Sequence, residues 1–166
     1  MNARGAFVLG FVAGVALAGV AMVQAMPRLM LQERTSALGV EETVQLITQR
    51  VAAAGWVVSS VMPLDQSVRK HGGADLPPVR LVNICQAHHA SRVLADPADR
   101  RLAVMMPCTI AVFEGAGGET RVATMNAGLM GRMFGGEVAR VMAGPVAREQ
   151  AGFVADLAAT GAPAPQ

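Results

Sequence analysis

The stretch of sequence that decides the fold is VRLVNICQAHHASRVLADPADRRLAVMMPCTIAVFE, residues Val79–Glu114. It begins with a run of β-branched and apolar residues, Val79–Ile84, and ends with a similar run, Cys108–Glu114. Such short apolar runs are typical of buried strands. Between them, Gln86–Ala95 carries apolar residues at helical spacing. The stretch therefore predicts a strand, a helix and a second strand.

The neighbouring segments extend this pattern into an α+β domain. Val40–Ala54 has its apolar residues on one helical face, and Gly55 follows as a stop signal. Trp56–Met62 is rich in β-branched residues and predicts another strand. The glycines of Gly115–Gly118 predict a hairpin turn that leads into a returning strand, Thr120–Met125. Because hairpins join antiparallel strands, we expect a small, mainly antiparallel sheet with helices packed on one face.

The C-terminal part is predicted to be mostly helical. Glu137–Leu157 has the length and composition of a helix, but Gly144-Pro145 should bend or split it. The last residues, 158–166, are small and rich in proline, so we expect a disordered tail.

The N-terminal part holds an uninterrupted apolar run, Ala6–Val23, preceded by Arg4. A membrane-spanning helix needs about 20 apolar residues, which this run reaches only with its flanks. A secretory signal has a shorter apolar region and a small-x-small cleavage site, which Val23-Gln24-Ala25 matches imperfectly. We favour an uncleaved transmembrane anchor over a cleaved signal peptide, and both would send the rest of the chain across a membrane. The predicted division is an anchor or signal segment with its linker at 1–34, an α+β domain at 35–157 and the tail.

Composition excludes some function classes. An apolar fraction of 52% and a charged fraction of 16% provide ample material for a core. The net charge of +2 is spread thinly, without the basic stripe of a nucleic-acid-binding surface. The chain has five Phe, one Trp and no Tyr, which provides no platform for stacking bases. We therefore expect no nucleic-acid partner.

Three segments together resemble a known family. These are the strand Val79–Cys85, the helix that ends in Leu94–Pro97, and the Met-Pro-Cys strand Met106–Glu114. They resemble the bacterial and archaeal family catalogued as domain of unknown function 302, over roughly Thr35–Leu157. The resemblance implies a small α+β domain that forms dimers and is sometimes joined to a membrane or signal segment. It implies no reaction, because the role of the family is not settled.

The residues able to carry chemistry are concentrated in the same stretch. Cys85 and Cys108 lie at the ends of two strands that we expect to be neighbours, and a His pair follows Cys85 by about one helical turn. Thiolate, imidazole and thioether ligands suit copper, zinc or haem iron. The predicted ligands are Cys85, His88, His89, Met106 and Cys108. The favoured function is metal or haem binding, or thiol redox. We expect the domain to be held at the bacterial inner membrane and to face the periplasm. If the N-terminal segment is cleaved, the domain would instead be exported in soluble form.

Other interpretations of these residues stay open. In an oxidising compartment Cys85 and Cys108 would form a disulfide if they are close, or they could be buried, inert thiols. A catalytic Cys–His pair is conceivable, but no acid that would orient the histidine can be assigned, so the sequence does not decide whether this is an enzyme. The alternative function is a non-catalytic accessory subunit of a membrane complex, with Gly128–Gly136 as an exposed apolar patch.

Overall fold

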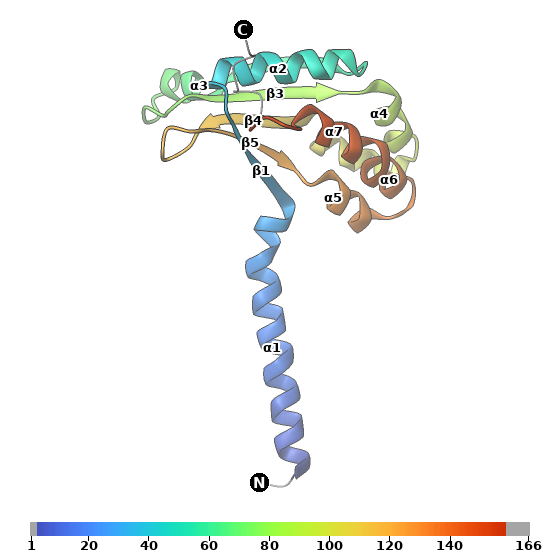
Figure 1. Ribbon diagram of the computed structural model, residues 1–166. Coiled ribbons are helices and arrows are strands. Elements are labelled where there is room, and N and C mark those ends of the chain that lie inside the picture. The colour runs from blue at the N-terminus through green and yellow to red at the C-terminus, as the bar shows by residue number, and fades with distance from the viewer. Residues whose placement is uncertain (1–2, 159–166) are drawn as a thin grey trace.

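The computed structural model describes the backbone of residues 3–158 and the side chains of residue 11 and residues 14–158 (Figure 1). The predicted disordered tail lies outside the described residues, apart from Ala158. In chain order the elements are α1 (Ala3–Met30), β1 (Leu31–Ser36), α2 (Val40–Ala53), β2 (Val57–Pro63), α3 (Leu64–Lys70), β3 (Val79–Cys85), α4 (Ala87–Leu94), the 3-10 helix η1 (Pro97–Met105), β4 (Cys108–Glu114), β5 (Thr120–Met125), α5 (Ala127–Phe134), α6 (Gly136–Val141), the π turn η2 (Met142–Val146) and α7 (Ala147–Phe153).

Within the described residues, five strands form one sheet in the order β1-β5-β4-β3-β2, and all its neighbouring strands are antiparallel. Strands β3, β4 and β5 lie side by side in the centre, with Ile84 opposite Cys108 and Val112 opposite Val122. The predicted α+β class and the antiparallel order of the sheet are confirmed. Strands β3 and β4, which form the two ends of the stretch Val79–Glu114, are thus direct neighbours.

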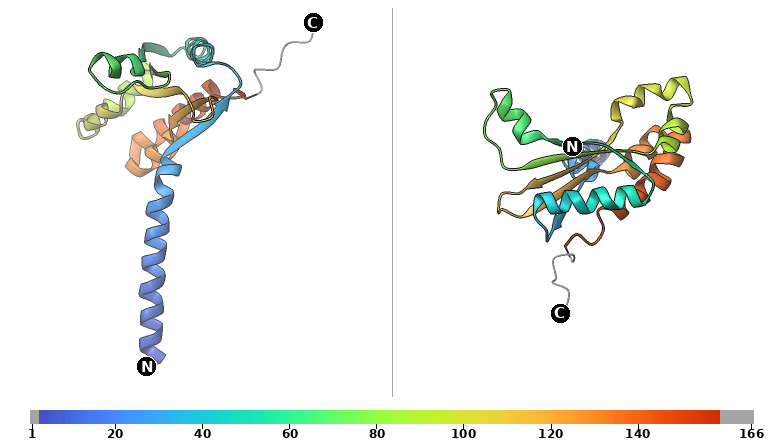
Figure 2. Two further views of the ribbon diagram at one scale, coloured as in Figure 1. Left: turned by 90° about the vertical axis from the view of Figure 1, so that its left-hand side faces the viewer. Right: turned by 90° about the horizontal axis from the view of Figure 1, so that it is seen from above.

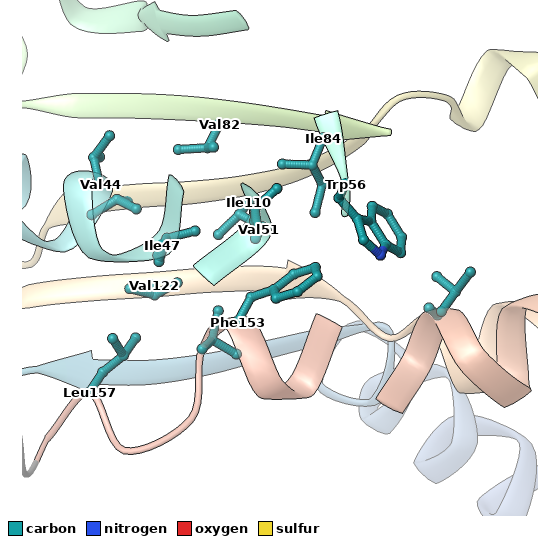
Figure 3. Packing of buried hydrophobic residues seen from close by; sticks show 14 of the residues in the cluster. Val44, Ile47, Val51, Trp56, Val82, Ile84, Ile110, Val122, Phe153 and Leu157 are labelled. Carbon is teal, nitrogen blue, oxygen red and sulfur yellow. The ribbon is translucent and has the colours of Figure 1, made fainter. Parts of the chain in front are cut away.

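The hydrophobic core lies on one face of this sheet, where α2 and the C-terminal segment cover it (Figure 3). Buried and half-buried positions alternate along β3, β4 and β5, as expected for strands with one face in a core. The fully buried aliphatic residues of the sheet and of α2 include Ile47, Val51, Val82, Ile84, Ile110, Val112 and Val122. Helices α4, α5 and α6 gather at the end of the sheet where β3 ends and β4 begins, whereas α3 lies at the opposite end (Figures 1 and 2).

Helix α2 begins where the sequence predicts it, because its first turn is capped. Glu42 accepts a hydrogen bond from the backbone N–H of Gly39 at 2.9 Å, which satisfies a donor that the helix leaves unpaired. Thr43 and Ser36 join their hydroxyl groups at 2.8 Å and tie the helix to the end of β1. The helix buries Val44, Ile47 and Val51 against the sheet, so the predicted apolar face is the face that packs.

The N-terminal part differs from the prediction, since the expected linker contains a strand. Leu31–Ser36 forms β1, which pairs with β5 from Leu31 opposite Met125 to Ser36 opposite Thr120. The sequence LQERTS has no apolar alternation, because this edge strand buries only Ser36. Backbone pairing and an ion pair between Arg121 and Glu33, 2.7 Å apart, hold it in place. The sheet therefore begins at Leu31 and not at residue 35.

Helix α1 extends away from the domain and includes Pro27 near its end (Figures 1 and 2). Several of its described apolar side chains are largely exposed, including Leu17 at 71% and Val23 at 72%. In the part of the chain that the structure describes, no helix combines the length and the apolar character that crossing a membrane requires.

The C-terminal helical region is split at the predicted place. Helix α6 ends at Val141, and the π turn Met142–Val146 contains Gly144 in a non-helical conformation and Pro145. Proline lacks the N–H that a continuous helix needs, and its ring clashes with the preceding turn. The chain therefore changes direction before α7, which brings Met142 and α7 to the end of the sheet that holds the two cysteines.

Candidate functional site

The candidate site lies where β3 ends and β4 begins. Cys85 is the last residue of β3, Cys108 is the first residue of β4, and Ile84 pairs directly with Cys108. The antiparallel register therefore brings the two cysteines to the same end of the sheet. Both are half-buried free thiols, without the disulfide that the sequence leaves open as an alternative.

Both thiols border one small cavity, which we call the thiol cavity. Its volume is about 30 Å³, enough for a single ion or water molecule. Its lining residues are Trp56, Ile84, Cys85, Gln86, His89, Ala90, Val93, Met106, Pro107, Cys108, Val141, Met142 and Val146. Four of the five predicted ligands are among them. The fifth, His88, is exposed and does not line the cavity.

A second cavity, which we call the methionine cavity, adjoins the first. Its volume is also about 30 Å³, and its lining consists of Val93, Leu102, Met105, Met106, Cys108, Met130, Gly131, Phe134, Val138 and Met142. A third cavity of about 20 Å³ lies beside Met125 and Gln150. Cys108 and Met142 border all three cavities. Cys108 is therefore the centre of a sulfur-rich region to which five of the eleven methionines contribute.

The surroundings of Cys108 keep its thiol neutral. Burial raises the pKa of Cys108, and the neighbouring Cys85 raises it further. A protonated thiol is a weak nucleophile, because the thiolate is the reactive form. At rest, Cys108 is thus poorly suited to attack a substrate. A bound cation would compensate the cost of forming the thiolate.

A histidine–carboxylate–tryptophan group borders the thiol cavity. The side chain of Gln86 accepts a hydrogen bond from the backbone N–H of His89 at 3.0 Å and caps α4. His89 Nε2 lies 3.5 Å from Glu149 Oε1, and Trp56 Nε1–H donates to Glu149 Oε2 at 2.5 Å. Among the described residues, His89 Nδ1 is buried without a hydrogen-bond partner. The imidazole is therefore oriented on one side and has a free nitrogen on the other.

Glu149 is an acid beside His89 that sequence reasoning missed. It lies on α7, far along the chain from His89, and its position on an amphipathic helix resembles that of any surface glutamate. Met142 was missed for a similar reason, since it sits in the π turn that only the folded chain brings to Cys108. No local pattern in the sequence distinguishes either residue.

Helices α4 and α6 are joined across the methionine cavity. Arg92 of α4 donates from Nε to Glu137 Oε1 of α6 at 2.9 Å, and Arg140 donates to Glu137 Oε2 at 2.7 Å. The hydrogen bonds from Arg140 and Arg92 lower the pKa of Glu137 below its usual value. The residues that follow Arg92 and Glu137 in sequence, Val93 and Val138, line the cavity. This ion-pair network therefore holds two walls of the cavity together.

The described residues contain no group of three or more His, Cys, Asp or Glu side chains arranged to hold a metal ion. Methionine is not among those residue types. Cys85, Cys108, Met106 and Met142 nevertheless line one cavity together with His89. The arrangement favours soft ligand chemistry over the usual carboxylate and imidazole sets.

Comparisons with known proteins agree with this fold. The family model described as "Domain of unknown function DUF302" matches residues 32–157, a span that begins within β1. No curated protein matches the chain. The crystal structure of an uncharacterized conserved DUF302 protein from Bacillus stearothermophilus is similar, with a TM-score of 0.67 and 16% sequence identity. The match covers 77% of this chain and 98% of that one, and at this identity it shows the fold alone. The chain belongs to the DUF302 family.

Proposed function

We propose that this protein binds a soft metal ion, Cu(I), in the thiol cavity, through Cys85 and Cys108 with Met106 as a thioether ligand. The observation that carries the proposal is the convergence of these three sulfur-bearing side chains on one cavity of about 30 Å³. His89 lines the same cavity, and its Nδ1 has no hydrogen-bond partner among the described residues. His88 has no place in the proposal, because it lies outside the cavity.

The donor types favour copper over zinc. Thiolate and thioether sulfur select Cu(I), whereas protein zinc sites are built from Cys, His and carboxylate ligands in a tetrahedral arrangement. Within the described residues no three such side chains are grouped in that way. Cu(I) accepts fewer ligands and readily binds methionine. The methionines that surround Cys108 therefore support Cu(I) as the ion.

The size of the cavity also distinguishes between the candidate cofactors. Sites for organic ligands usually have volumes of roughly 300–1,000 Å³. The thiol cavity, at about 30 Å³, has room for an ion and no room for a haem. The small volume therefore supports an ion over a haem as the ligand.

Thiol redox at the same pair has weaker support. A redox cysteine usually has a lowered pKa, because exchange begins with a thiolate. Burial and the proximity of Cys85 raise the pKa of Cys108 instead. Binding of Cu(I) would displace the thiol proton, so we expect the affinity for Cu(I) to increase with pH.

The test is a Cu(I) titration of the full, reduced chain in competition with a chromophoric Cu(I) chelator such as bathocuproine disulfonate. We expect a single ion per chain, and loss of binding in the double variant Cys85→Ser/Cys108→Ser. Met62→Leu is the matched control, because Met62 is an exposed methionine on β2 that lines neither the thiol nor the methionine cavity. Equal, weak binding by the wild-type chain and the double variant would overturn the proposal.

We further propose that α1 holds the domain at the bacterial inner membrane, on the periplasmic side. The support is the apolar run Ala6–Val23 and the exposure of apolar side chains such as Phe11 on a helix that extends away from the domain. Fractionation after alkaline washing should leave the full chain with the membranes, and protease added to spheroplasts should digest the domain. Recovery of the intact chain in the soluble fraction would show that α1 is no anchor.

A second candidate function is an accessory subunit of a membrane complex. The support is the exposure of Met133 at 60% and Phe134 at 41%, which lie in the segment expected to form an apolar patch. Purification from gently solubilised membranes should then recover a larger complex. A homodimer free of other proteins would contradict the accessory role and would agree with the dimer that the family resemblance implies.

A further inference from the structure

The methionine cavity shares Met106, Cys108 and Met142 with the thiol cavity. Its other sulfur atoms come from Met105 and Met130, and the rest of its lining is aliphatic, aromatic or glycine. No carboxylate, imidazole or amide side chain is among its lining residues. An ion that passes through this cavity would therefore meet sulfur ligands and no oxygen or nitrogen ligand from a side chain.

The outer end of this cavity is formed by α5. Met130 and Phe134 are four residues apart on this helix, so they share one face, and both line the cavity. Phe134 is 41% exposed, whereas Met130 and Cys108 are both half-buried. The sulfur-lined wall thus runs from a helix at the surface to the first residue of β4.

We infer that the methionine cavity is the uptake route by which Cu(I) reaches the thiols, with Met130 as the first ligand inside the protein surface. The inference rests on the proposed function and adds the route to it. Met106 and Met142 border both cavities and would pass the ion from thioether to thiol.

Each step is a ligand exchange without electron transfer. A thioether is a neutral donor that binds Cu(I) without losing a proton. When Cys108 replaces a thioether, a Cu–thioether bond breaks, a Cu–thiolate bond forms and the thiol proton passes to solvent. The copper stays Cu(I) throughout. A route of neutral sulfur donors would thus carry the ion to Cys108 without the release of a proton until the last step.

The route predicts a kinetic effect without an equilibrium effect. Replacing Met130 by Leu removes the sulfur and nearly conserves the side-chain volume. We expect Met130→Leu to slow the transfer of Cu(I) from the chelator by about tenfold, a barrier increase of about 1.4 kcal/mol, while the equilibrium affinity is unchanged. Met133→Leu is the matched control, because Met133 lies on the same helix, is 60% exposed and does not line the cavity.

The measurement is stopped-flow loading of the full, reduced chain with Cu(I) from bathocuproine disulfonate, followed by an equilibrium titration of each variant. Wild-type loading rates in Met130→Leu would overturn the route and indicate direct access through the thiol cavity. A parallel loss of equilibrium affinity would also overturn it, because Met130 would then be a ligand of the final site. Absence of Cu(I) binding in the wild-type chain would instead refute the proposed function, so the two failures are distinguishable.

Discussion

At one end of β3, Arg80 lies against two carboxylates, and at the other end Cys85 lies near a second thiol. Arg80 Nη1 is 2.5 Å from Asp65 Oδ1, and Arg80 Nη2 is 2.6 Å from Glu41 Oε1. The backbone N–H of Val79 also donates to Asp65 at 3.3 Å. The charges at this end are paired with one another, so removing one partner would leave an unpaired charge and destabilise the fold.

The Cys85 end of the same strand is different. Both thiols are free, and His89 Nδ1 has no hydrogen-bond partner among the described residues. Small cavities surround Cys108, where a domain of this size would otherwise be closely packed. Unpaired donors together with unfilled space are what a binding site requires, and the Arg80 end has paired donors instead. The comparison shows that one strand has charged side chains paired at one end and free thiols beside small cavities at the other.

The largest loss of stability is expected when the Arg80 end is broken. Arg80→Met would leave the Asp65 carboxylate without its guanidinium partner, so Tm should fall more than in any variant below, while Cu(I) binding is retained. Desolvation alone would raise the pKa of Asp65, but the Val79 N–H and the Arg80 charge outweigh it and lower the pKa. A lowered pKa in the folded state stabilises the protein above the unfolded value of about 3.9.

This stabilisation is lost as the pH falls through the lowered pKa of folded Asp65. The difference in Tm between wild type and Arg80→Met should therefore shrink when thermal unfolding is measured below about pH 4. A difference that is constant from pH 7 to this range would show that the ion pair with Asp65 is not its source.

The next largest effect is expected at Gly131, in the wall of the methionine cavity. A Cβ at this position would lie 2.6 Å from Met142 Cβ and 2.9 Å from the backbone nitrogen of Ala143. Gly131→Ala should therefore push α5 away from the π turn and cost about 2 kcal/mol in denaturant unfolding. Gly128→Ala on the same helix is the control, because its Cβ would meet only ordinary contacts at 3.5 Å and beyond. Equal stabilities of the two variants would contradict the tight packing.

A smaller effect is expected at the group that orients His89. Glu149→Leu removes the acceptor of the Trp56 indole N–H and should cost about 1 kcal/mol in urea unfolding. Because Trp56 is the only tryptophan, its fluorescence spectrum should change as well. Glu149→Gln keeps a carbonyl oxygen for the indole and serves as the control. An unchanged spectrum in Glu149→Leu would count against the hydrogen bond.

The smallest effect is a dependence of stability on alkaline pH. Burial and Cys85 raise the pKa of Cys108, so the folded protein holds this proton more tightly than the unfolded chain does. The stabilisation is complete below the unfolded thiol pKa of about 8.5 and is lost as the pH rises through the raised value.

The chain has no Tyr and a single Lys, so few other side chains titrate in this range. The unfolding free energy of Cys108→Ala should depend less on pH between about 8.5 and 10 than that of the wild type. Parallel curves for the two proteins would contradict the raised pKa.

Much of the fold was predictable because its signals are local. The strands Cys108–Glu114 and Thr120–Met125 have the predicted bounds, and α2 differs from its prediction by one residue. Strand β1 was missed because it is a polar edge strand that backbone hydrogen bonds hold in place, and such bonds leave no mark in the side-chain pattern.

The site was predictable only in part. The sequence indicated that Cys85, Met106 and Cys108 lie near one another, because they are at the ends of strands that were expected to be neighbours, and the structure places all three along one cavity. His88 was included because it follows Cys85 by about one helical turn, but in the structure it is exposed and does not line the thiol cavity. Whether these residues bind a metal stays a prediction that the Cu(I) titration tests.

By itself, the sequence determined the α+β class, the central strands and the collection of both cysteines at one end of the sheet, because apolar periodicity and turn residues act over short distances along the chain. The tertiary structure alone decided that Glu149 lies beside His89, that Met130 and Met142 line a cavity with Cys108, and that Leu31–Ser36 completes the sheet. These relations join α7, α5, the π turn and β1 to elements far away in the sequence. They depend on how packed elements meet in space, which no local pattern of residues encodes.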